Sequence, residues 1–334
     1  MTEHSRITPP GGMPGKRPDK AKRRSLFERA DDAFGQGLGP ADVPRDLPQA
    51  PRRPQPQETP PAGKPASEKA TSETPIAPAE GRVPSHQAAR VALSGPPQVV
   101  DRTRLGSEGL IVPEDPATGQ LEEFRIVKRE LLAEARIGGD DLARRILVCS
   151  PHPGEGKTYC ATNLAIAMAA ERNIEVVLVD ADVVKPSVAQ RLGIEGGTGL
   201  MDVLADPAIR PESCVIRTDI EGLFVLPAGS PNVRDAEYLS SARTGEVFDR
   251  LTRGAPNRVL IFDTPPALSA SPAAELAAHV GQAVLVARAD ETGRAALEDA
   301  RQLLSACADI KLLLNAARYS PSGRRFGDYG KGRD

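Results

Sequence analysis

Short aliphatic runs alternate with helical stretches from residue 145 onward. The runs lie at 145–149, 175–180, 222–227, 258–263, 283–287 and 310–314. They are rich in leucine, isoleucine and valine and lack the alternation of a strand that has one face in water. Such runs are typical of parallel strands that helices cover on both faces. The sequence therefore predicts an α/β domain with a mostly parallel central sheet.

Three further elements are expected before these runs. Residues 109–113 (Gly-Leu-Ile-Val-Pro) predict an extended segment, and apolar residues at helical spacing predict a helix over 119–135. Ser25 and Glu28 have the spacing of a capping box, and apolar residues follow on one face. This pattern predicts a short helix at 25–35, which serves either as a docking element or only as a nascent helix.

Composition divides the chain into three parts. Eighteen of the 32 prolines lie before residue 101, among Gly, Ser, Gln and Glu and with few aliphatic residues. Such a segment buries too little apolar surface to offset its ordering entropy. We therefore expect a disordered arm at 1–101, a globular domain at 102–318 and a flexible tail at 319–334.

Charge and cysteine content restrict the partners. The net charge of −2 predicts no nucleic-acid partner. Basic runs at 16–24 and 318–333 are either solvated segments or contacts for anionic lipid head groups. Four scattered cysteines indicate no disulfide framework, which fits a reducing cytoplasm. With no signal peptide and no apolar stretch of about 18 residues, we expect no membrane span.

The first strand run leads into a glycine-bearing loop, Pro151-His152-Pro153-Gly154-Glu155-Gly156-Lys157-Thr158. A strand, such a loop and Gly-Lys-Thr at the start of a helix are the arrangement that binds nucleoside triphosphates. Glycines let backbone N–H groups surround an anion, and the helix dipole favours the phosphates. We expect nucleotide contacts from Gly154, Glu155, Gly156, Lys157, Thr158 and Tyr159. A plain surface turn is the alternative.

Acidic residues end two of the predicted strands. Asp180 and Asp182 follow one run and Asp263 ends a later one, so all three should project toward the rim that carries the loop. We assign Thr158, Asp182 and Asp263 to Mg²⁺, and Lys157, Asp180 and Asp182 to catalysis. Asp180 suits a general base; the alternative for each acid is a turn cap.

Asn315 follows the last strand run. At the same rim its amide could hydrogen-bond an adenine ring. An asparagine after a strand is equally an ordinary turn residue.

Three motifs together resemble one family. They are Pro-Gly-Glu-Gly-Lys-Thr (153–158), Val-Asp-Ala-Asp (179–182) and Asp-Thr-Pro-Pro (263–266). This combination resembles the bacterial protein-tyrosine autokinases of exopolysaccharide synthesis and export, a branch of the P-loop ATPases. The resemblance runs from about residue 110 to 318, and residues 25–30 are similar to the exosortase-associated type.

The resemblance implies roles for particular residues. Gly154 to Thr158 would form the Walker A loop, Asp180 and Asp182 the second acidic motif, and Asp263 the Walker B acid. The family self-associates through a helix in which Glu122, Arg125 and Lys128 hold the matching positions here, with Lys128 in place of an arginine. Its acceptors are tail tyrosines that a neighbouring subunit phosphorylates, which here would be Tyr319 and Tyr329.

The chain also departs from its relatives at three positions. Pro151 replaces the usual first glycine of the loop, and Val184 stands where many relatives have an arginine. His152 stands where the chromosome- and septum-positioning ATPases have a signature lysine, which argues against that branch.

The expected protein is thus a cytoplasmic, ATP- and Mg²⁺-dependent tyrosine autokinase at the inner face of the cytoplasmic membrane. Its partners would be an inner-membrane polysaccharide chain-length or export protein and further copies of itself. Two alternatives remain open: an ATPase switch that hydrolyses ATP without modifying tyrosine, and an ATP-bound scaffold of the export machinery without turnover.

Overall fold

The computed structural model describes residues 89–116, 118–137, 141–231 and 234–317. The helix predicted at 25–35, the tail 319–334 and both tail tyrosines lie outside the described residues, as does the predicted arm up to residue 88.

The described residues form eight strands. They are β1 (Pro97–Gln98), β2 (Arg145–Cys149), β3 (Glu175–Asp180), β4 (Ile216–Thr218), β5 (Leu223–Leu226), β6 (Arg258–Asp263), β7 (Gln282–Arg288) and β8 (Asp309–Asn315). The six predicted runs correspond to β2, β3, β5, β6, β7 and β8. The prediction of an α/β domain with a mostly parallel sheet is confirmed.

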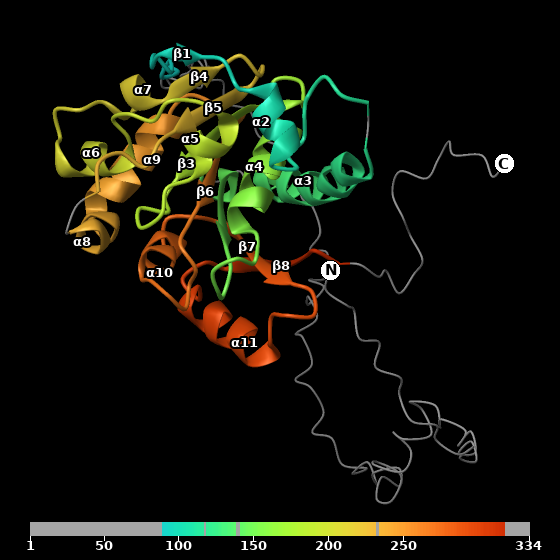
Figure 1. Cartoon of the computed structure of the whole chain (residues 1–334). Helices are drawn as coiled ribbons and strands as arrows, with labels where there is room; N and C mark the ends of the chain where they lie inside the picture. Colours follow the sequence, from blue (N-terminus) through green and yellow to red (C-terminus); the bar gives the residue numbers. More distant parts are fainter. Residues whose placement is uncertain (1–88, 117, 138–140, 232–233, 318–334) are drawn as a thin grey trace, which may run out of the picture. The chain divides into compact units, whose positions relative to one another are not determined.

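The strands form one sheet in the order β1-β4-β5-β3-β6-β2-β7-β8, seen at the centre of Figure 1. Neighbouring strands are parallel except β4 and β5, which pair antiparallel. In the pairing of β3 with β6, Asp180 lies opposite Asp263. Because β2, β3 and β6 run in one direction, their carboxyl ends meet at one rim.

Helices fill the connections. They are α2 (Arg102–Ser107), α3 (Gly119–Ile137), the 3₁₀ turn η1 (Leu142–Arg144), α4 (Lys157–Ala169), α5 (Val188–Leu192), α6 (Leu200–Ala205), α7 (Pro211–Cys214), α8 (Asp235–Leu239), α9 (Ala242–Thr252), α10 (Pro272–Ala277) and α11 (Arg294–Leu303). The predicted helix at 119–135 is α3.

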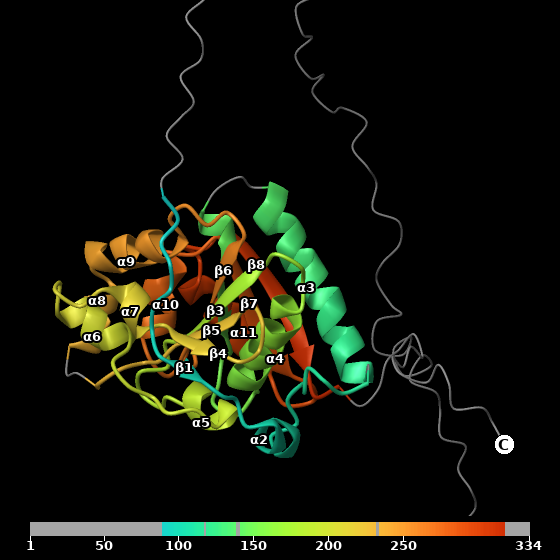
Figure 2. The ribbon, with the colours of Figure 1, turned by 90° about the horizontal axis from the view of Figure 1, so that it is seen from above.

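Two hydrophobic layers hold the sheet. Alternate residues of each strand contribute to opposite layers: Leu178 packs with α3, α4 and α5, whereas Val177 and Val179 pack with α6, α9 and α10. Figure 2 shows α3 and α4 on one side of the sheet and α6 and α9 on the other. Both faces are therefore buried, as the continuous aliphatic runs predicted.

Ordered structure begins before residue 102, where the sequence placed the domain boundary. The backbone N–H of Val91 donates to the Arg253 carbonyl, and Val100 is 2% exposed. Arg258, only 1% exposed, anchors this strip, because its Nη2 donates to the Val91 carbonyl at 3.0 Å while its Nε donates to Glu175 at 2.9 Å. A few apolar positions and one buried arginine thus order residues that composition alone assigns to the arm.

None of the helices in the described ranges has the length and the hydropathy that crossing a bilayer would demand.

We predict that Arg258→Ala lowers the free energy of unfolding by about 3 kcal/mol, because removing one partner of a buried, hydrogen-bonded charge leaves its acceptors unpaired. Urea unfolding measures this loss, and hydrogen exchange at Val91 should accelerate. Arg253→Ala, at an exposed neighbour, is the control and should change stability by less than about 0.5 kcal/mol. Equal effects of the two substitutions would contradict this anchoring role.

Candidate active site

The loop after β2 has the backbone geometry of an anion cradle. Gly154 and Gly156 have φ values of 84° and 98°, and α4 begins immediately after Gly156. A Cβ on Gly156 would lie 2.1 Å from Nδ2 of Asn315, so no larger residue fits there. Among the described residues, none accepts a hydrogen bond from the backbone N–H groups of residues 154–159. These donors are available to phosphate oxygens.

Side chains from distant elements brace this loop. Glu155, 5% exposed, accepts a hydrogen bond from the His152 N–H at 2.7 Å and another from the Thr292 hydroxyl. Arg288 donates from Nη1 to the Gly154 carbonyl at 3.2 Å. The Glu155 carboxylate thus holds the loop together, and the predicted contact of Glu155 with nucleotide stays a prediction. Arg288 and Thr292 were not foreseen, because nothing local in the sequence links them to the loop.

Lys157 points across the site to the second acidic motif. Its Nζ lies 2.7 Å from Oδ2 of Asp182, and both side chains are largely buried. The other Asp182 oxygen accepts a hydrogen bond from the Lys185 N–H at 3.0 Å. The structure therefore brings together two of the residues that the sequence assigned to catalysis, as a buried ion pair.

Asp180 is oriented by backbone N–H groups at the start of α5. Its Oδ2 accepts hydrogen bonds from Ser187 and Val188, each at 3.0 Å, and its Oδ1 accepts one from Asp182 at 3.3 Å. Burial raises the pKa of Asp180 to about 6, against the opposing effect of these hydrogen bonds. A carboxylate with such a pKa is ionised at neutral pH and still basic enough to accept a proton.

Asp263 is completely buried and lacks partners. Neither carboxylate oxygen has a hydrogen-bond partner in the described part of the chain; the Thr158 hydroxyl lies nearby, but no ordinary hydrogen bond joins them. Burial raises the pKa of Asp263 to about 7, although the positive charge of Lys157 opposes the shift. A buried carboxylate without a partner fits a role in holding a cation, directly or through water.

The acids do not by themselves form a metal centre. No group of three or more His, Cys, Asp or Glu side chains within the described ranges is arranged to hold a metal. Mg²⁺ commonly uses only one or two carboxylates together with substrate phosphates. The assignment of Thr158, Asp182 and Asp263 to Mg²⁺ thus fits the donors present and stays a prediction.

Tyr159 and Asn315 lie beside the loop, not over it. The Tyr159 hydroxyl is hydrogen-bonded to Gln120 of α3 at 2.8 Å, and its ring packs near Phe124. Asn315 donates from Nδ2 to the Glu155 carbonyl at 2.9 Å. Its predicted contact with adenine stays a prediction, because the amide already serves the loop.

The three predicted self-association residues separate into two environments. Glu122 and Arg125 form an exposed ion pair one turn apart on α3. Lys128 is 8% exposed and ties α3 to α4, donating to the Ala167 carbonyl at 2.9 Å and pairing with Glu171 at 2.8 Å. Only the first two present their charges to a neighbouring molecule.

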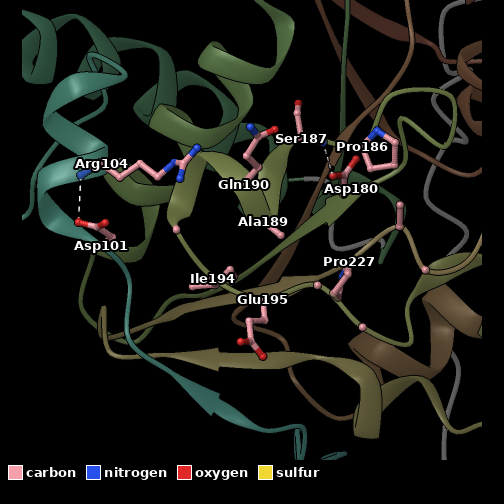
Figure 3. Close-up of a pocket in the computed structure, with 15 residues that line it drawn as sticks. Asp101, Arg104, Asp180, Pro186, Ser187, Ala189, Gln190, Ile194, Glu195 and Pro227 are labelled. Carbon is pink, nitrogen blue, oxygen red and sulfur yellow. Dashed lines mark hydrogen bonds between the residues drawn. The ribbon is translucent and has the colours of Figure 1, made fainter.

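A cavity of about 570 Å³ opens beside Asp180. Residues of α2, the start of α5, the 193–197 loop and the 227–229 turn line it. Figure 3 shows Asp180 at one side of this cavity and Arg104 of α2 reaching in from the other. The second acidic motif thus faces both the loop and an open space large enough for a side chain.

Comparison with known proteins agrees with this geometry. A family model described as ParA, an NUBPL iron-transfer P-loop NTPase, matches residues 141–225. Over these residues the chain is similar to that family. The match covers β2, the loop and both acids of the second motif, but it ends before Asp263.

Relatives that this chain resembles are named bacterial tyrosine-protein kinases. EpsB of Ralstonia nicotianae, named as such a kinase, is 31% identical over 226 residues, which cover 65% of this chain and 28% of EpsB. The tyrosine-protein kinase YwqD of Bacillus subtilis is 29% identical over 223 residues, which cover 66% of this chain and 91% of YwqD. This chain therefore matches less than a third of EpsB but most of YwqD.

Among solved structures, the BceF tyrosine kinase domain is similar in fold to the described domain of this chain. The two superpose with a TM-score of 0.52 at 21% identity, over 67% of this chain and 93% of that domain.

We predict that Asp263→Asn stabilises the nucleotide-free domain. Because the pKa of Asp263 is raised to about 7 in the folded state, the folded protein binds more protons than the unfolded one, and stability falls as pH rises from about 4 to 7. Asparagine removes this penalty. At pH 8 with EDTA, we expect the unfolding temperature to rise by roughly 5 °C, an advantage that disappears near pH 4.

Calorimetry across this pH range provides the test. Asp299→Asn, on the exposed face of α11, is the matched control and should show no such pH dependence. A lower unfolding temperature for Asp263→Asn at pH 8 would show that the buried carboxylate is not a destabilising charge.

Proposed function

We propose that this chain is an ATP- and Mg²⁺-dependent protein-tyrosine autokinase that regulates exopolysaccharide synthesis or export. One observation carries the proposal. Asp180, a buried carboxylate with a pKa near 6, faces an open cavity on one side and the Lys157–Asp182 pair on the other. A nucleotide switch needs only the loop and its lysine. A kinase also needs a base that faces space for a second substrate, and Asp180 meets this requirement.

In the proposed reaction, an acceptor tyrosine oxygen attacks the γ-phosphorus while the bond from phosphorus to the β–γ bridging oxygen breaks. The tyrosine proton passes to Asp180, and ADP leaves. The free N–H groups of residues 154–159 and the Lys157 ammonium would neutralise charge on the phosphates. Mg²⁺, when bound, supplies further charge neutralisation at the β- and γ-phosphates. Thr158, Asp182 and Asp263 would hold it.

The acceptors would be Tyr319 and Tyr329, which lie in the tail that follows β8 in the sequence. A neighbouring copy would present them. The names of the relatives support kinase activity. We propose a cytoplasmic location at the inner face of the membrane, with an inner-membrane polysaccharide chain-length or export protein as partner. The basic segments at 16–24 and 318–333 would contact anionic lipid there.

Intact-mass analysis of the purified chain with Mg-ATP tests the proposal. We expect added phosphate on the parent and none on Lys157→Met or on the double variant Tyr319→Phe/Tyr329→Phe. Asp180→Asn should slow transfer by at least about 100-fold, since it removes the base. ATP hydrolysis without added mass would contradict the kinase proposal and favour a nucleotide-switched ATPase. If neither added phosphate nor ATP hydrolysis is found, even with membranes that carry the partner, the scaffold alternative is favoured.

We also propose that α3 mediates self-association through Glu122 and Arg125, whose exposed pair can exchange partners with a second copy. Glu122→Ala with Arg125→Ala is expected to shift the parent's assembly toward monomer in light scattering. Glu130→Ala, exposed on another side of α3, is the control and should leave the assembly intact. An unchanged mass for the double variant would place the contact elsewhere.

A further inference from the structure

The cavity beside Asp180 is lined by Arg104, whose guanidinium forms no ion pair among the described residues, although the carboxylates of Asp101, Asp180 and Glu195 line the same cavity. Arg104 of α2 lines the cavity and extends toward Gln190 (Figure 3). Its Nε is buried without a hydrogen-bond partner, and no described residue accepts a hydrogen bond from its guanidinium. Because an unpaired, partly desolvated guanidinium is costly, it suits a ligand that brings a carboxylate or another planar anion.

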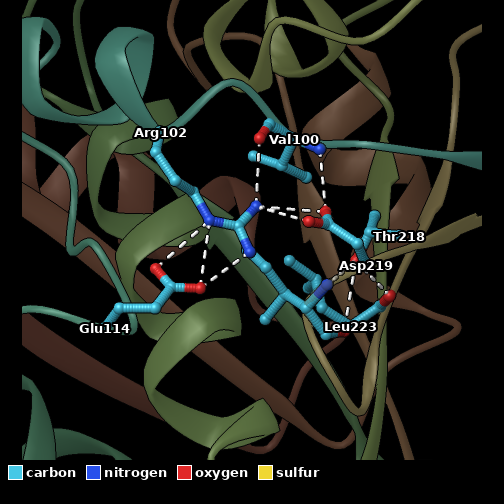
Figure 4. A network of polar contacts seen from close by, with 7 residues as sticks. Val100, Arg102, Glu114, Thr218, Asp219 and Leu223 are labelled. Atoms are coloured by element: carbon cyan, nitrogen blue, oxygen red, sulfur yellow. Dashed lines mark hydrogen bonds and ion pairs between the residues drawn. The ribbon is translucent and has the colours of Figure 1, made fainter.

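The backbone that carries Arg104 is firmly held. Figure 4 shows Arg102, two residues earlier, donating from Nη1 to the Val100 carbonyl and to Asp219, each at 3.0 Å, and pairing with Glu114 at 2.8 Å. Asp101 caps α2 by accepting a hydrogen bond from the Arg104 N–H at 3.0 Å. These contacts fasten α2 to the turn between β4 and β5. The fold therefore presents Arg104 from a fixed position.

Glycine backbone forms part of the wall of the cavity between Arg104 and Asp180. A Cβ built on Gly196 or on Gly197 would meet no atom within 4 Å, so this wall of the cavity is open. At the other side, a Cβ on Gly193 would lie 2.5 Å from the Asp101 Cβ and 3.4 Å from the Arg104 Cδ, so the glycine leaves room for the arginine stem. An extended peptide fits such glycine-lined walls, because it needs main-chain contact and little width.

The tail offers two tyrosines with opposite neighbours. Asp328 directly precedes Tyr329, whereas Arg318 directly precedes Tyr319. In an extended peptide, successive side chains point to opposite sides. A tyrosine directed at Asp180 would therefore send the preceding side chain away from it, toward the end of the cavity where Arg104 lies.

We propose that Arg104 binds the carboxylate of an acidic residue that directly precedes the acceptor tyrosine. This specificity rests on the kinase function proposed above. It selects Asp328-Tyr329 over Arg318-Tyr319, since an arginine at the preceding position repels Arg104. The preferred substrate class is an extended segment with the sequence acidic residue followed by tyrosine, supplied by the tail of a second copy.

The test uses the full chain with both tail tyrosines changed to phenylalanine, and fluorescent peptides of residues 318–334 that carry Tyr319→Phe. Phosphorylation of Tyr329 and peptide affinity, from fluorescence anisotropy without ATP, are both measured. Asp328→Asn in the peptide should lower kcat/KM and affinity by about tenfold. Arg104→Gln should cause a similar loss with the parent peptide and should no longer distinguish the two peptides. Arg172→Gln, at an exposed residue that follows α4, should behave as the parent.

A charge reversal keeps the test decisive if Arg104→Gln folds poorly. Arg104→Glu should bind the Asp328→Lys peptide better than the parent peptide, an inversion that general damage cannot produce. Equal affinity of the parent chain for both peptides, or discrimination that survives Arg104→Gln, overturns the proposal. Arg104-dependent binding without phosphate transfer would refute the kinase function and leave the recognition intact.

Discussion

The rim of this sheet depends on one positive charge among three buried carboxylates. The register of β3 against β6 sets Asp180 opposite Asp263, and Asp182 follows two residues later; none of the three is more than 4% exposed. Burial disfavours each negative charge, and proximity adds to the cost. Lys157 pairs with Asp182 and opposes the rise in the pKa of Asp263, while backbone N–H groups at the start of α5 stabilise Asp180. Without these donors, the strand ends could not carry the acids that the site requires.

Much of this arrangement was predictable from sequence because it is local or follows from strand direction. The aliphatic runs located six strands, and the rule that ligands bind beyond parallel strand ends placed Lys157, Asp180 and Asp263 at one rim. β4 was missed because Ile216-Arg217-Thr218 is too short to show a pattern, and its antiparallel partner decides its conformation. β1 and α2 were missed because they are short and contribute few apolar residues, such as Val100 and Leu105, while polar contacts across the fold, such as that of Arg102 with Asp219, help to hold them.

The parts of the site that sequence could not predict are those that act across the fold. Thr292 and Arg288 reach the loop from the β7–α11 connection, more than 130 residues away along the chain. Arg104 carries no motif, and its isolation is visible only once the side chains around it are in place. For Lys128, the resemblance to the family suggested an exposed charge that takes part in self-association. Because α3 packs on α4, its ammonium instead donates to the Ala167 carbonyl. The spacing of residues in the sequence identifies candidate site residues, whereas the packing of the helices and strands decides which groups each side chain contacts.

The Lys157–Asp182 pair would also link the proposed nucleotide binding to the rest of the rim. A lysine that reaches the β- and γ-phosphates would share its ammonium between them and Asp182, which weakens the Lys157–Asp182 ion pair. That sharing would leave an Asp182 oxygen more available at the rim that also carries Asp263, whose oxygens have no partner in the described structure. Arrival of the phosphates would thus create the free carboxylate that a divalent cation needs. The negative charge left on Asp182 would at the same time hold up the pKa of Asp180 and keep it a competent base.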